Sequence, residues 1–199
     1  MPSATYKNHH FHIRGMLPAL LLFASVGIAE PSPAQVLRGQ SWAASTGSVD
    51  EGSISKYEFV GTDAFVRSSL PTGHVLLRYN VVPTNELEMP AEVGIECWQL
   101  GVDFLDNGRG ARVQVNLYAQ SVFAGGNKAL IGTFDSNLFP PSTSFQKSFP
   151  GCNAPTLPNF CFVSSCGGFV YYIDAYLTKS ASEGTPGLRA IWVGIVGEQ

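Results

Sequence analysis

The chain is poor in histidine and in charged residues. It has four histidines among 199 residues, and three of them (His9, His10 and His12) lie near the N-terminus, so only His74 remains beyond that region. Charged residues make up 14% of the chain, against about 25% in typical soluble domains. Its basic residues form no run, whereas nucleic-acid binding requires a concentrated cationic face. We therefore expect no nucleic-acid partner, no metal site built on several histidines and no cofactor.

Long hydrophobic runs are also missing. The longest, Leu17 to Ile28, falls short of the roughly 20 residues that cross a bilayer. Lys7 and Arg14 precede it, and small residues follow at Ala29 and Ala34. This pattern is typical of a secretory signal peptide. We expect cleavage after Ala34 or Ala29, one domain over residues 35–199, and a secreted product, extracellular or periplasmic, that does not span the membrane.

All four cysteines lie beyond the predicted leader, at Cys97, Cys152, Cys161 and Cys166. In an exported chain they predict two disulfides, with three pairings open. One pairing joins Cys161 to Cys166 across a short loop and leaves Cys97 with Cys152. A zinc site is disfavoured because the close C-x2-C pairs typical of such sites are absent.

Apolar residues alternate with a period of two, and no stretch has the pattern of an amphipathic helix. With 21 glycines and 13 prolines, the chain reads as short strands separated by turns. The expected strands cover residues 56–60, 64–67, 74–82, 97–106, 112–119, 129–134, 168–178 and 188–196. They predict an all-β fold, an antiparallel β-sandwich of Greek-key or jelly-roll type.

Four details of topology follow from the same pattern. Asp106-Asn107-Gly108 predicts a hairpin turn, so residues 97–134 are expected to form a three-stranded meander. The last strand is apolar on both faces and is expected to be central in its sheet. Residues 35–55 are expected to form a loose arm or an edge strand, and residues 137–158 a crossover between sheets.

Little in the sequence indicates catalysis. His74 is the only candidate base, no G-x-S-x-G motif is present, and His74 itself reads as a structural or solvent-facing residue. Glu86, Glu88, Glu92 and Glu96 lie in one acidic loop, followed by Asp103 and Asp106. The simpler interpretation of this cluster is a solvent-exposed acidic loop, and the more specific alternative is a calcium-binding site. We predict that the protein is not an enzyme.

The best candidate for ligand binding is a polar and aromatic face. Tyr172, Asp174 and Tyr176 alternate outward on one expected strand, and Gln114, Asn116 and Tyr118 do so on another. If the two strands are neighbours, rings for stacking lie beside amides and a carboxylate that hydrogen-bond hydroxyls. Cross-strand packing of tyrosines explains the same pattern without a ligand.

Three functional hypotheses remain. The first is a non-catalytic extracellular binding or surface-associated protein, with a glycan or an envelope component as partner. The second is a glycan-active hydrolase using carboxylates such as Glu96, Asp103 or Asp174. The third is a structural envelope component that self-associates. The sequence leaves the oligomeric state open.

Overall fold

The structure is a computed structural model that describes residues 36–82, 97–123, 126–148 and 168–197. These residues belong to one compact unit, Pro33–Gln199. The predicted signal peptide, the glutamates of the acidic loop, and Cys152, Cys161 and Cys166 lie outside the described residues, so the predictions made on them stay predictions. Cys97 is the first residue of a strand.

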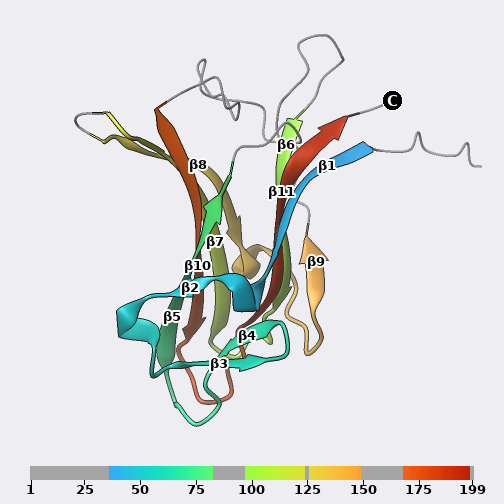
Figure 1. Ribbon diagram of the computed structural model, residues 1–199. Coiled ribbons are helices and arrows are strands. Elements are labelled where there is room, and N and C mark those ends of the chain that lie inside the picture. The colour runs from blue at the N-terminus through green and yellow to red at the C-terminus, as the bar shows by residue number, and fades with distance from the viewer. Residues whose placement is uncertain (1–35, 83–96, 124–125, 149–167, 198–199) are drawn as a thin grey trace, which may run out of the picture. The chain divides into compact units, whose positions relative to one another are not determined.

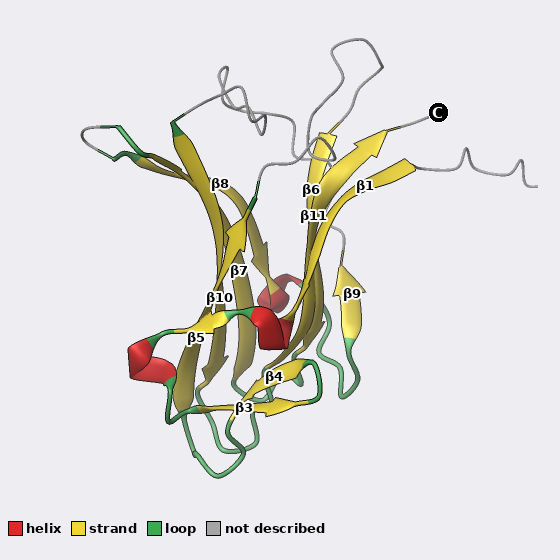
Figure 2. Cartoon of the chain, in the orientation of Figure 1, coloured by secondary structure: helices red, strands yellow, loops and turns green. Residues whose placement is uncertain are grey.

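The described chain folds into two antiparallel sheets packed on one another (Figure 1, Figure 2). Sheet A contains β1 (Val36–Ala43), β3 (Tyr57–Val60), β4 (Asp63–Val66), β6 (Cys97–Leu105), β9 (Gln146–Ser148) and β11 (Gly187–Gly197). Sheet B contains β2 (Ser48–Val49), β5 (Gly73–Val81), β7 (Ala111–Ser121), β8 (Lys128–Asp135) and β10 (Phe169–Lys179), in the order β2-β5-β10-β7-β8. The predicted all-β sandwich is confirmed.

Helical structure within the described residues is limited to three short 3-10 helices, η1 (Ala44–Thr46), η2 (Glu51–Ser53) and η4 (Ser136–Leu138). None of the helices there has the length and apolar character needed to span a membrane.

The core lies between the sheets and follows the period of two that the sequence shows. Along β5, β7 and β10 every second side chain is buried: Val75, Leu77, Tyr79, Val81, Val113, Val115, Leu117, Ala119, Tyr171, Ile173, Ala175 and Leu177. Phe169 continues the same alternation, which predicts that it faces inward, but it is 46% exposed at the beginning of β10. The alternation predicts which side of a strand faces the core but not where the core ends.

The last strand is central, as its two apolar faces predict. On one side β11 pairs with β6, and on the other with β1 and, at its start, with β4. β1 is thus an edge strand rather than a loose arm. The chain then passes through η1 to β2 in sheet B, and later from β8 in sheet B through η4 to β9 in sheet A. The crossover expected over 137–158 is confirmed for its described part.

The predicted meander is wrong at its first turn. β7 pairs with β8 as expected, but β6 lies in sheet A and does not pair with β7. The connection after β6 does turn tightly, with positive φ at Gly108 and Gly110. However, Asn107 hydrogen-bonds Glu183 and Thr185 in the loop between β10 and β11. Both connections carry the chain from one sheet to the other, which a local turn signal does not distinguish from a hairpin.

Candidate functional site

The predicted polar and aromatic face exists as one surface because β10 and β7 are neighbours. Their register places Tyr172 opposite Tyr118, Asp174 opposite Asn116 and Tyr176 opposite Gln114. Opposed residues of an antiparallel pair project from the same side of the sheet. The Tyr118 and Tyr172 ring centroids are 5.3 Å apart. We call this outer surface of sheet B, with the residues of β5 and β8 beside it, the tyrosine face.

Asp174 lies in the middle of the tyrosine face and is only 1% exposed. Arg78 of β5, directly opposite it, donates from Nε and Nη2 to its two carboxylate oxygens, at 2.7 and 2.9 Å. This hydrogen bonding raises the pKa of Arg78. A carboxylate held by a two-pronged guanidinium contact is compensated for its burial. Asp174 therefore holds Arg78 in place rather than meeting solvent.

Lys128 of β8 lies over the two tyrosines. Its Nζ is 3.5 Å from the centroid of the Tyr118 ring, 5.2 Å from that of Tyr172 and 4.0 Å from Asp174 Oδ2. Hydrogen bonding to Tyr172, together with the nearby Tyr118 and Asp174, raises the pKa of Lys128, so the side chain carries its charge at neutral pH. The contact has the geometry of a cation–π interaction.

Together these contacts determine which groups meet solvent. The side chains of Arg78 and Lys128 are 51% and 43% exposed, whereas Tyr172 is 9% exposed and Asp174 is buried. Leu130, opposite Tyr118 on β8, adds a 53% exposed apolar side chain. The tyrosine face thus presents two cationic hydrogen-bond donors beside an apolar surface, with the carboxylate and one ring beneath them.

Arg78 and Lys128 were not among the binding residues predicted from the sequence. The position of Arg78 was predictable, because the clear alternation along its strand places it on the outward side. The sequence gives no sign that Lys128 lies on this face, because a β-bulge interrupts the register between β7 and β8. Tyr118 pairs with Leu130 while Leu117 pairs with Gly132, so Ile131 is the extra residue. The bulge keeps Lys128 and Leu130 on the outer surface together with Thr133, which donates to Asn116 Oδ1 at 2.8 Å.

His74 lies at the other end of the tyrosine face. It is exposed, its ring stacks near Tyr176 at 5.6 Å between centroids, and its Nδ1 is 3.1 Å from Thr178 Oγ1. These neighbours are the Thr178 hydroxyl and the Tyr176 ring, and no carboxylate of the described residues is hydrogen-bonded to His74 to orient its ring as a base.

The carboxylates proposed for a hydrolase are spread over the molecule. Asp174 lies on the outer side of sheet B, whereas Asp103 is opposite Ala190 and Lys147 within sheet A. Asp106 is buried in the connection after β6, where it accepts from Gly108 N and Ser136 Oγ. Two carboxyls that flank one glycosidic bond lie within about 10 Å of each other on one cleft, and Asp103 and Asp174 project from different sheets. Glu96 lies outside the described residues.

The described residues also hold no group of three or more histidine, cysteine or acidic side chains able to bind a metal ion. The glutamates of the predicted acidic loop are outside this statement, so calcium binding there remains untested.

Comparisons with known proteins place the chain in no family. No protein-family model matches it, and no curated protein does. Among solved structures it is similar to a carbohydrate-binding module, TmCBM61, in complex with beta-1,4-galactotriose. That similarity covers 82% of this chain and 88% of the module, with 13% sequence identity and a TM-score of 0.35. A likeness at this level shows nothing about function.

Proposed function

We propose that this chain is an exported, non-catalytic binding protein whose tyrosine face holds a glycan. The observation that carries the proposal is the pair of half-exposed cations, Arg78 and Lys128, held over buried or half-buried tyrosines by Asp174. Fixed donors beside an apolar surface suit a ligand that offers oxygen acceptors and C–H groups together.

The roles differ from those expected from the sequence. Tyr118 and Tyr172 support the cations, and Asp174 positions Arg78, whose guanidinium is 4.7 Å from the Tyr172 ring centroid. Arg78 and Lys128 donate to hydroxyl or carboxylate oxygens of the glycan. Leu130 and the partly exposed Tyr176 provide apolar contact, and Asn116 is held by Thr133.

Preorganisation favours binding over simple packing as the role of this face. Two long cationic side chains lose conformational entropy when a ligand orders them. Here the tyrosine rings and Asp174 already order the Arg78 and Lys128 side chains in the folded protein. The loss of their conformational entropy therefore accompanies folding and does not weaken ligand binding.

The test is binding of the purified protein to an array of neutral and acidic oligosaccharides and to insoluble polysaccharides, comparing wild type with Lys128→Ala. The variant removes one exposed donor, and such exposed contacts contribute about 1 kcal/mol or less to folding. We expect binding at least tenfold weaker with a nearly unchanged melting temperature.

Lys56→Ala is the matched control, because Lys56 is a partly exposed lysine near β3, away from the tyrosine face, and only its backbone makes recorded hydrogen bonds. Equal binding by wild type, Lys128→Ala and Lys56→Ala, or no binding to any glycan, would show that the tyrosine face is packing alone.

A further inference from the structure

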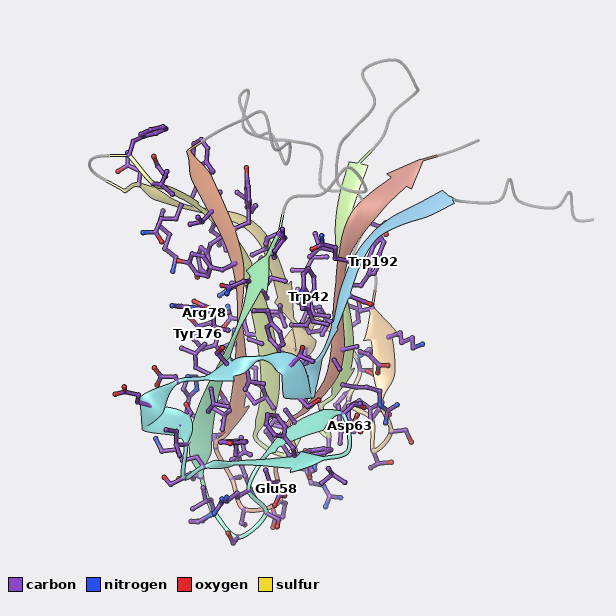
Figure 3. All side chains as sticks on the ribbon, viewed as in Figure 1. Trp42, Glu58, Asp63, Arg78, Tyr176 and Trp192 are labelled. Carbon is purple, nitrogen blue, oxygen red and sulfur yellow. The ribbon has the colours of Figure 1, made fainter. Side chains whose placement is uncertain are left out.

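A second surface, on the outer side of sheet A, contains a cavity that the sequence did not indicate. Its volume is about 210 Å³, and it is lined by Ser41, Gly101, Val102, Asp103, Lys147, Ala190, Ile191 and Trp192. Figure 3 shows Trp192 beside β1 and β11, on the side away from Arg78 and Tyr176, while Trp42 lies between the sheets.

Strand register explains why an opening exists there. Trp192 of β11 is opposite Ser41 of β1 and Gly101 of β6, and in the next row Ala190 is opposite Asp103. Trp192 thus has small residues on both sides and leaves room beside its indole. The indole nitrogen lies close to Gly39, because a Cβ added at that glycine would be 3.0 Å from it.

Asp103 supplies the polar group of the cavity. It is 9% exposed, and its buried Oδ1 has no hydrogen-bond partner within the part of the chain that the structure describes. A buried carboxylate oxygen without a donor is costly. Burial accordingly raises the pKa of Asp103, although Arg189 and Lys147 oppose the shift. Because Asp103 lines the cavity, a ligand there that donates a hydrogen bond to the carboxyl offsets part of the cost of its burial.

Lys147 of β9 lies opposite Asp103 and is exposed. Arg189, the other cation nearby, is engaged by both oxygens of Asp63 and lies over the Phe145 ring. No salt bridge within 4.0 Å joins Lys147 to Asp103 among the described residues. A group that bridges them must donate to a carboxylate and accept from an ammonium. A hydroxyl does both, whereas an anion repels Asp103 and an amine repels Lys147.

The size of the cavity and the chemistry of its lining residues further restrict the class of ligand. The cavity is smaller than the roughly 300–1,000 Å³ of typical small-molecule sites, so it accommodates one ring and not a long ligand. Partly exposed indole offers a flat apolar surface for C–H groups. We propose that this cavity is a second binding site, separate from the tyrosine face, that takes one neutral hexopyranose unit, with Asp103 and Lys147 on a hydroxyl and Trp192 against the ring.

The test is saturation-transfer-difference NMR with methyl glycosides of neutral hexopyranoses at millimolar concentration. We expect transfer to ring C–H protons in the wild type and at least a fivefold loss in Asp103→Asn. Ala190→Leu fills the cavity without removing either polar group and is expected to abolish the signal. Melting curves establish that each variant is folded.

Lys128→Ala is the control that separates this proposal from the function proposed for the tyrosine face. Transfer that persists in Lys128→Ala and disappears in Ala190→Leu supports the cavity as the site. Transfer that disappears only in Lys128→Ala, or no transfer from any glycoside, overturns the proposal and leaves a cavity that holds water alone. The first of these two results would place the glycoside on the tyrosine face, whereas the second leaves polysaccharide binding by that face to its own test.

Discussion

Two buried carboxylates, Asp174 and Asp103, differ in whether hydrogen bonds compensate for their burial. Asp174 is 1% exposed and receives two hydrogen bonds from Arg78. Asp103 is 9% exposed, and its Oδ1 receives no hydrogen bond from a described residue. The first carboxylate stabilises a network, whereas the second lowers stability and lines a cavity. At the scale of single residues, this difference separates a structural acid from a candidate binding acid.

Replacing Asp103 by asparagine is expected to stabilise the ligand-free protein at neutral pH, by about 1 kcal/mol. Burial raises the pKa of Asp103, so the folded state binds its proton more tightly than the unfolded state does. Wild-type stability is therefore lost as pH rises from about 3.9, the ordinary carboxyl value, through the raised pKa. The gain of Asp103→Asn over wild type should shrink as pH falls through this window.

Urea unfolding of both proteins between acidic and neutral pH measures this difference. Asp135→Asn is a useful contrast, because hydrogen bonding from Arg112 lowers the pKa of Asp135 and its substitution should destabilise at neutral pH. A neutral-pH loss of stability in Asp103→Asn would show that the carboxylate has a partner in the folded protein.

At the scale of elements, the connection between β6 and β7 decides the topology. Gly108 and Gly110 have φ of +69° and +77°, and a Cβ added at Gly110 would lie 2.7 Å from Ser180 Oγ and 2.9 Å from Ala181. Ser180 N also donates to Gly110 O at 2.7 Å. The end of β10 is thus attached to the beginning of β7, although the chain reaches β7 from sheet A.

Gly110→Ala is expected to destabilise the protein by about 3 kcal/mol, combining backbone strain with the displacement of Ser180 and Ala181. Gly61→Ala is the matched control, because Gly61 has a similar φ of +65° and nothing within 4 Å of an added Cβ. Gly61→Ala should destabilise the protein only through backbone strain, by about 1 kcal/mol. Equal losses in the two variants, measured by chemical denaturation, would contradict the close approach at Gly110.

Strand positions were largely predictable because the period of two survives along β5, β7 and β10. β5, β7 and β10 bury the residues that the alternation assigns inward, apart from Phe169. Strand pairing was not predictable at the turn after β6, because a tight turn has the same residues whether it joins strands of one sheet or of two. β6 and β7 therefore read as a hairpin but belong to different sheets.

The candidate residues on β7 and β10 were predictable for the same reason, but their environment was not. Tyr118, Tyr172 and Asp174 project outward as expected. Arg78 reaches them from β5, which is distant in the sequence, and Lys128 from β8, on the far side of a β-bulge. The cavity on sheet A could not be predicted from any one segment of the sequence, because β1, β6, β9 and β11 all contribute to its lining.

At the scale of the whole molecule, the predicted export and disulfides remain to be measured. Mass spectrometry of the protein recovered from a secreting host, before and after reduction, is expected to show a chain beginning at Gln35 or Glu30. Reduction should add two hydrogens for each of two disulfides. An uncleaved chain whose mass does not change on reduction would contradict export and with it the extracellular setting of the proposed function.

The amino-acid sequence by itself determined the class of fold, the inward face of the long strands and the outward placement of the tyrosines, because these depend on local alternation along one strand. Apart from the pairing of β7 with β8, only the tertiary structure decided which strands are neighbours. It placed Arg78 and Lys128 over Tyr172 and Tyr118, and it put Asp103 beside Trp192 in a cavity. Each of these sets of contacts forms within one sheet when its strands pair, and most of them join strands that are far apart in the sequence.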